Sequence, residues 1–283
     1  MASTRDTTWR YVLVIVAVAL SLAAWFCTVL GLYSTVNVTF ESYLTASVWV
    51  LLFVASVLLY TSQYGLVPNC ILFYPVFGAS FNLLLGSLTV RSQLPLFFDC
   101  IGTAIVAIIA GPVLGMATGL TTTVLGGVYF AYDLAFAPVG IFIGAAVGLL
   151  ARRGAFKKLS WTIFSGLGMG LGAGVISVYV LIFSFSGRPR KGPENLTKFY
   201  ELIFQDERVA IISQGLTSDV LDKVFTVLIA CLVLRFMPRA LARHYTVTFN
   251  SEVLRKVLDA PDPRAESDAS ATPARAAKQH ASA

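Results

Sequence analysis

Long apolar runs without a charged residue are the feature that most constrains how this chain folds. A helix needs about 20 mostly apolar residues to cross the hydrocarbon core of a bilayer, and the 283-residue sequence holds several such runs. Hydrophobic residues make up 57% of the chain and charged residues only 13%, whereas soluble proteins have about 45–50% and ~25%. The composition predicts an all-α, polytopic membrane protein and argues against a soluble enzyme, a nucleic-acid binder or a disulfide scaffold.

Eight transmembrane spans are predicted from the long apolar runs, most of which lack charged residues. The mixed-charge segment 186–218 is long enough for a structured lid or binding element, and the polar segment 244–283 is expected to be largely disordered. The predicted spans are residues 11–32, 44–61, 69–90, 99–116, 118–131, 136–151, 160–185 and 219–238.

Basic residues in the connecting segments predict the orientation, because Lys and Arg concentrate in cytoplasmic loops. One cluster covers residues 152–158, a second follows the last span, and Arg5 and Arg10 precede the first. All three groups agree if both termini are cytoplasmic and the number of spans is even. We therefore expect a multi-pass protein of the cytoplasmic membrane.

Glycines repeat every fourth residue in three of the predicted spans, a spacing that lets helix backbones approach closely. We expect these glycines to pack a tight bundle. Ala19 with Ala23, and Gly78 with Ala79, form two further patches that predict either partner docking or internal packing. The three glycine rows are Gly111, Gly115 and Gly119; Gly140, Gly144 and Gly148; and Gly166, Gly170 and Gly174.

Five ionisable residues lie near the predicted outer ends of the spans, where charges are costly and usually serve a site or a structural pair. Asp219 and Lys223 are four residues apart and can pair on one helix face, whereas Asp222 is expected to be turned away. Asp99 and Asp133 are either binding residues or helix caps. The five, together with Asn82 inside the third span, are our candidate ligand contacts, with Asn82 alternatively serving helix packing.

Enzymatic chemistry is poorly supported by the sequence. The two histidines, His244 and His280, lie beyond the last span, so neither a His-based triad nor a His metal site is expected. No Gly-x-x-x-x-Gly-Lys-Ser/Thr phosphate loop occurs. We expect no catalytic activity, cofactor or metal, and if ATP is used, another chain must bind it.

Three segments resemble one family of transport proteins. Residues 94–103 read Leu-Pro-Leu-Phe-Phe-Asp-Cys-Ile-Gly-Thr and are followed by Gly111-Pro112-x-x-Gly115. The second segment runs from Phe136 to Gly154, and the third joins Asp219-x-x-Asp-Lys to Met-Pro-Arg at 237–239. In this order and spacing, they resemble the substrate-binding S components of energy-coupling-factor (ECF) vitamin transporters, over residues 69–243.

The resemblance implies a six-helix core, residues 67–243, that binds a vitamin or related small molecule from outside. It implies partners as well: a transmembrane coupling protein and a pair of ABC ATPase subunits, alongside the lipid bilayer. Asp99 and Thr103 become pocket residues, and small residues of the core's first helix, Gly78 and Ala79, become docking candidates. The Ala-x-x-x-Ala pair found in many members occurs instead at Ala19 and Ala23, in the two extra spans of residues 1–66.

Two other classes of function stay open. A membrane sensor or scaffold would signal through the carboxy-terminal tail, although the roughly 40 residues of 244–283 offer no output domain. A secondary transporter with its own ion coupling would place acidic residues nearer the middle of the membrane than the predicted positions of Asp99, Asp133 and Asp219. Neither composition nor motif identifies the substrate.

Overall fold

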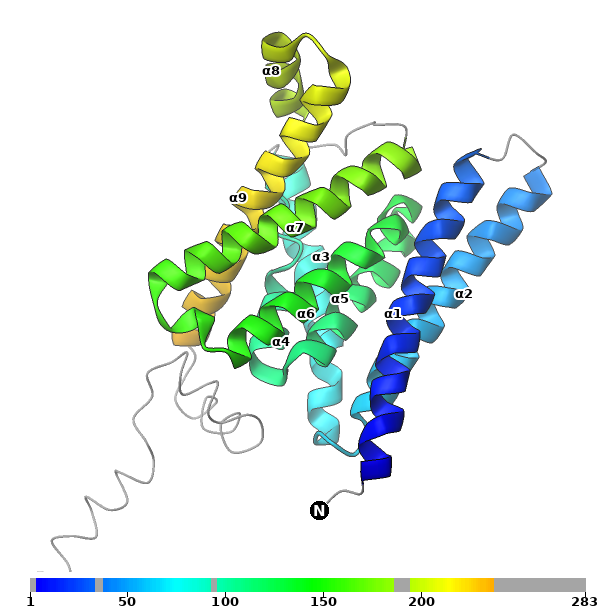
Figure 1. The fold of residues 1–283 in the computed structure, drawn as a ribbon, viewed down its shortest axis with the longest axis vertical. Helices are drawn as coiled ribbons and strands as arrows, with labels where there is room; N and C mark the ends of the chain where they lie inside the picture. The colour runs from blue at the N-terminus through cyan, green and yellow to red at the C-terminus, as the bar shows by residue number, and fades with distance from the viewer. Residues whose placement is uncertain (1–3, 34–37, 93–95, 186–193, 237–283) are drawn as a thin grey trace, which may run out of the picture.

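The computed structural model describes residues 4–33, 38–92, 96–185 and 194–236, and these residues form helices without a β-strand (Figure 1). The α-helices are α1 (Thr4–Tyr33), α2 (Val38–Gln63), α3 (Tyr74–Ser92), α4 (Ile101–Ala110), α5 (Pro112–Tyr129), α6 (Ala137–Arg152), α7 (Leu159–Phe185), α8 (Glu194–Phe204) and α9 (Glu207–Arg235). Three short 3-10 helices connect them: η1 (Asn69–Phe73), η2 (Ala131–Phe136) and η3 (Ala155–Lys157). The all-α prediction is confirmed.

Five helical stretches among the described residues are long and apolar enough to cross a membrane. Their outer surfaces carry large apolar side chains, such as Phe53, Phe77 and Phe164, which are each more than 60% exposed. So much exposed apolar surface suits contact with lipid rather than water, as expected of a multi-pass membrane protein. The five stretches are Thr8–Thr28, Thr45–Gln63, Asn69–Thr89, Ala131–Arg152 and Leu159–Phe183.

The predicted boundary between the fourth and fifth spans is wrong. The chain breaks at Gly111, which has a φ of +91° and ends α4, and Pro112 then starts α5. A glycine adopts this left-handed φ without the strain that a side chain causes, and proline is suited to the first turn of a helix because it lacks an N–H. Helix α4 has 10 residues, about 15 Å, so it covers only half of a hydrocarbon core of ~30 Å.

Apart from Gly111, which lies at the break between α4 and α5, the glycine rows pack the bundle as the sequence predicts. A side chain at Gly119 would collide with the backbone of Gly140, and one at Gly144 with the backbone of Gly115, so α5 and α6 touch backbone to backbone. The third row faces α9, where a side chain at Gly170 would collide with Cα of Val220. These contacts hold α5 against α6 and α7 against α9.

Gly78 and Ala79 do not form an outer surface. Gly78 lies against α4, where an added Cβ would come within 3.1 Å of the carbonyl oxygen of Gly102, and Ala79 is fully buried. The docking role predicted for this pair is therefore wrong for the described conformation, because both residues are buried inside the bundle. Ala19 and Ala23 on α1 are exposed.

Helices α1 and α2 form a hairpin beside the bundle, drawn in blue in Figure 1. The hairpin packs on α5 and α6 through an apolar cluster that includes Leu52 and Leu59 from α2 and Leu120 from α5. Arg10 ties α1 to the end of α2, because its guanidinium donates hydrogen bonds to the carbonyl oxygens of Ser62 (2.7 Å) and Tyr64 (2.9 Å). The hairpin of α1 and α2 is thus attached to the side of the bundle.

The mixed-charge segment 186–218 contains helix α8 and the first turns of α9. Helix α9 begins at Glu207 rather than at 219, and Asp206 caps it by accepting hydrogen bonds from the backbone N–H groups of Arg208 and Val209 at 2.8 and 3.1 Å. Figure 1 shows α8 and the start of α9 projecting beyond the other helices. The predicted disordered tail, 244–283, lies outside the described residues, as do residues 186–193.

Candidate ligand-binding cavity

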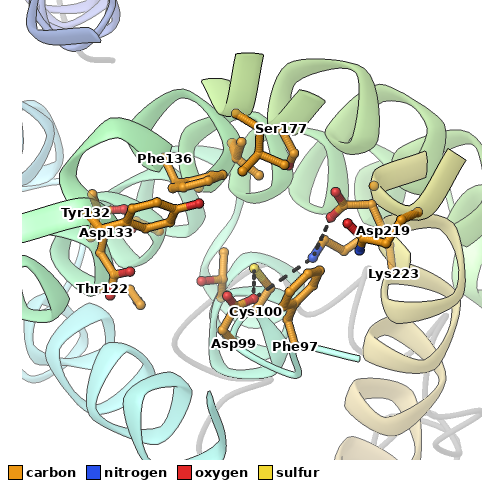
Figure 2. A pocket seen from close by; sticks show the side chains of 18 residues that line it. Phe97, Asp99, Cys100, Thr122, Tyr132, Asp133, Phe136, Ser177, Asp219 and Lys223 are labelled. Atoms are coloured by element: carbon orange, nitrogen blue, oxygen red, sulfur yellow. Dashed lines mark hydrogen bonds and ion pairs between the residues drawn. The ribbon is translucent and has the colours of Figure 1, made fainter. Parts of the chain in front are cut away.

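A cavity of about 110 Å³ lies inside the bundle. Helices α4, α5, α6, α7 and α9 line it, together with the segment before α4 and the 3-10 helix η2 (Figure 2). Its wall is formed by Phe97, Asp99, Cys100, Thr103, Gly119, Thr122, Thr123, Tyr132, Asp133, Phe136, Val139, Gly140, Ser177, Leu181, Gln214, Gly215, Asp219 and Lys223.

Three carboxylates surround the ammonium group of Lys223 on one side of this cavity. The Nζ atom lies 2.5 Å from Oδ2 of Asp222, 3.5 Å from Oδ1 of Asp219 and 4.0 Å from Oδ1 of Asp99. The side chains of Lys223, Asp219 and Asp222 are almost completely buried, whereas that of Asp99 is 31% exposed. The cluster therefore reaches the surface through Asp99, and desolvation strengthens the attraction among its buried members.

Asp222 connects α9 to the segment before α4. Its second oxygen, Oδ1, accepts hydrogen bonds from the backbone N–H groups of Phe97 (2.9 Å) and Phe98 (2.7 Å). Phe98 has a φ of +51°, a strained conformation for a bulky residue that persists only where its surroundings enforce it. The carboxylate of Asp222 supplies that constraint, and so positions Phe97 and Asp99 at the cavity.

The opposite wall carries aromatic rings and a further carboxylate. The rings of Tyr132 and Phe136 lie 5.4 Å apart between centroids, at 35° to each other, and Figure 2 shows both beside Asp133. Gly126 on α5 makes room for this acid, because an added Cβ would stand 2.7 Å from Oδ2 of Asp133. The cavity thus has a charged side and an aromatic side.

A buried amide organises the third part of the wall. Asn82 of α3 donates from Nδ2 to the hydroxyl oxygens of Thr103 and Thr122, both at 2.9 Å, and its Oδ1 accepts from the N–H of Gly102 at 2.6 Å. Asn82 does not itself line the cavity. It fixes two hydroxyls that do, so the packing interpretation of this residue is the one that the geometry favours.

The structure brings most of the predicted ligand contacts together. Asp99, Thr103, Asp133, Asp219 and Lys223 all line the cavity. The N-cap positions of α4 and α6 are occupied by Cys100 and Phe136 rather than by Asp99 and Asp133.

The expected pair of Asp219 and Lys223 is present. The prediction that Asp222 is turned away from it is wrong, because one carboxylate can contact the neighbouring lysine and still accept two backbone N–H groups.

Several lining residues were not predicted. Ser177 is polar, buried and surrounded by apolar sequence, so the criterion that selects Asn82 applies to it as well. Gln214 is buried too, but it lies in segment 186–218, outside the predicted spans. Tyr132 and Phe136 carry no such signal, because aromatic residues are common at the ends of membrane helices.

The arrangement suits binding of a compact polar ligand. Charged groups, hydroxyls and aromatic rings face one small space in otherwise apolar surroundings, which is how binding sites fix the orientation of a ligand. Among the described residues, no group of three His, Cys, Asp or Glu side chains is placed to hold a metal ion. No family model, no curated protein and no solved structure matches the chain.

Proposed function

We propose that this chain is the substrate-binding membrane subunit, or S component, of an ECF-type importer. One observation supports this most strongly: the three segments that resemble the family all contribute to a single cavity. Asp99 and Thr103 come from the first segment, Phe136 from the second, and Asp219 with Lys223 from the third. The role is to bind a vitamin or related small molecule from outside, without catalysis.

Under this proposal, the six-helix core consists of α3, α4, α5, α6, α7 and α9, and α1 with α2 are the two additional helices. The chain lies in the cell membrane with both termini in the cytoplasm. A transmembrane coupling protein and separate ABC ATPase subunits supply the transport path and the energy. Because Gly78 and Ala79 are buried, the exposed small residues Ala19 and Ala23 are the remaining candidates for docking to the coupling protein.

The size of the cavity limits what this conformation accepts. Sites for drug-sized ligands measure roughly 300–1,000 Å³, whereas this cavity measures about 110 Å³. A compact ligand fits the described conformation, and a larger vitamin requires the surrounding helices to separate. The segment carrying Phe97 and Asp99 holds a carboxylate that is 31% exposed and is one expected entrance to the cavity.

Co-expression with an ECF module tests the proposal. The chain should co-purify with the coupling protein and ATPases and should support ATP-dependent accumulation of its substrate in cells. Asp99→Asn should weaken substrate capture while leaving assembly intact, and Glu201→Gln, an exposed acid on α8, is the matched control. Absence of a complex with the module, or equal uptake by both variants, would contradict the proposal.

A second candidate function is ion-coupled secondary transport by the chain alone. The buried position of Lys223, Asp219 and Asp222 favours it, because ionisable groups inside a helix bundle often form proton or ion pathways. Asp219 lies 12 residues into α9, about 18 Å along the helix. Uptake into proteoliposomes that contain only this chain, driven by a proton or sodium gradient, would establish this function. Dependence on the ECF module would exclude it.

A further inference from the structure

A basic surface lies at the end of the bundle where α6 turns into α7. Arg153, Lys157 and Lys158 are exposed in this turn, and Arg235 is exposed at the end of α9. Helices α6 and α7 contain no Asp or Glu, and neither does α9 after Lys223. The elements that build this end of the molecule therefore supply cations and no acidic side chain to balance them.

The packing of α7 on α9 places Arg235 at the level of the turn. The two helices run in opposite directions (Figure 1), and a Cβ added at Gly166 would stand 2.7 Å from Cα of Val224. Arg235 follows Val224 by 11 residues, and counting 11 residues back from Gly166 reaches η3. Phe156 of η3 and Leu234 of α9 belong to one buried apolar cluster. The four cations thus come from two elements that are packed together.

Two contacts show how the turn presents its cations. The side chain of Lys157 folds back over Gly154, where its Cε would stand 3.1 Å from an added Cβ. Arg152 is directed elsewhere, because its Nη2 would stand 3.0 Å from a Cβ added at Gly111, at the break between α4 and α5. We therefore count Arg152 with the packing of the core and not with the basic surface.

The basic surface lies at the boundary of two membrane-spanning stretches. One stretch ends at Arg152 and the next begins at Leu159, so residues 153–158 lie directly beside the apolar part of the bundle. Leu159 and Trp161 are 68% and 61% exposed, and an exposed tryptophan near the end of a span is typical of the membrane interface. The headgroup layer of a bilayer is thus the neighbour of these cations.

We propose that this basic surface binds the headgroup of an anionic glycerophospholipid. Its phosphate accepts hydrogen bonds from Lys157, Lys158 and Arg235, since Lys and Arg bind phosphate oxygens strongly and clusters of them beside a span attract anionic lipids. Its acyl chains pack on Leu159 and Trp161, which a soluble phosphate has no means to contact. The inference requires that the chain spans a bilayer, and it does not depend on the proposed transport function.

Competition between two lipids tests the charge of the headgroup. The full chain in detergent receives equal amounts of phosphatidylglycerol and phosphatidylcholine with the same acyl chains, and native mass spectrometry shows which lipid is retained. We expect phosphatidylglycerol to be preferred. In Lys157→Gln/Lys158→Gln, the preference should fall about tenfold, because each cation at the membrane surface adds to the attraction. Lys198→Gln/Arg208→Gln removes two exposed cations from α8 and the start of α9, at the other end of the bundle, and should keep the preference.

Quenching of Trp161 fluorescence tests the place of binding. In phosphatidylcholine vesicles, a small fraction of brominated phosphatidylglycerol should quench the chain more than the same fraction of brominated phosphatidylcholine. This excess should vanish in Trp161→Phe and in Lys157→Gln/Lys158→Gln, and glycerol 3-phosphate should not reverse it.

Four results would overturn the proposal. Equal retention of the two lipids, or equal quenching by their brominated forms, would show that the headgroup charge is not recognised. An equal loss of preference in both double variants would trace the effect to net charge rather than to this surface. Reversal of the quenching by glycerol 3-phosphate would assign the surface to a soluble anion.

Discussion

The N-terminal hairpin and the core bundle solve the problem of packing in a membrane in different ways. The hairpin places buried apolar side chains beside exposed ones, such as Leu52 and Phe53. Among its described residues, the charged side chain that joins α1 to α2 by a hydrogen bond is Arg10. The core instead brings backbones together at glycines and buries three charged groups, with the partly exposed Asp99 beside them. Bilayer lipid gives apolar helices little drive to associate, so the costly features of the core indicate where function lies.

The largest effect is expected at Asp222, which holds Lys223 and the segment before α4. Asp222→Ala leaves a buried ammonium without its nearest carboxylate and two N–H groups without their acceptor, and should cost about 3–5 kcal/mol of stability. Thermal unfolding of the detergent-purified chain measures this. Glu201→Ala, an exposed acid on α8, should change little; equal stability of the two variants would show that the charge cluster is not structural.

The next largest loss of stability is expected at a glycine of α7 that packs against α9, compared with a glycine of the same helix that does not. Gly170→Ala drives a methyl group into the backbone of α9 and should cost about 1–3 kcal/mol. Gly168→Ala meets nothing within 4 Å and should be neutral or slightly stabilising, because alanine favours helix. The same unfolding measurement decides the point, and a larger loss at Gly168 would refute the described packing of α7 on α9.

A smaller effect is expected at the start of α9, outside the crowded core. Asp206→Ala removes a helix cap and should cost about 1 kcal/mol. Asp206→Asn keeps an acceptor oxygen and should retain most of the stability. Hydrogen exchange of the first turn of α9 reports the loss locally, and equal exchange in both variants would mean that the cap contributes nothing.

The smallest effect is expected on the lipid-facing side of the hairpin. Phe53→Ala should change stability by no more than about 0.5 kcal/mol, because this side chain contacts lipid whether or not the helices associate. Its neighbour Leu52 is fully buried, so Leu52→Ala leaves a cavity and should cost more. If Phe53→Ala proved the more damaging, this face of the hairpin would contact protein rather than lipid.

Much of the fold followed from local sequence. Charge-free runs and glycine spacing predicted the helices and their close contacts, since both properties act within a few residues. The break at Gly111 was missed because no charge interrupts the apolar run around it. The mixed charge of residues 194–204 does not by itself predict helix α8. The spacing of Leu196, Phe199 and Ile203 does predict it, because these apolar residues recur on one face of a helix.

The candidate site was predictable in its residue types and in the local pair of Asp219 with Lys223, but not in its long-range connections. Rare charges in an apolar chain singled out Asp99, Asp219 and Lys223. The approach of Asp99 to Asp219 and Lys223 depends on how α4 packs against α9, which brings together residues more than 100 positions apart. No local pattern contains that information. The bonds from Asp222 to the N–H groups of Phe97 and Phe98 are of the same kind.

Identification of the small molecule that co-purifies with the chain tests the central claim most directly. Mass spectrometry would compare the wild-type chain with Ser177→Phe, which fills the cavity, and with Val175→Phe, which adds the same ring on the exposed side of α7. The cavity predicts one vitamin-like compound bound to the wild type and to Val175→Phe, and missing from Ser177→Phe. The same compound in all three proteins, or no compound in any, would contradict a ligand site at this position.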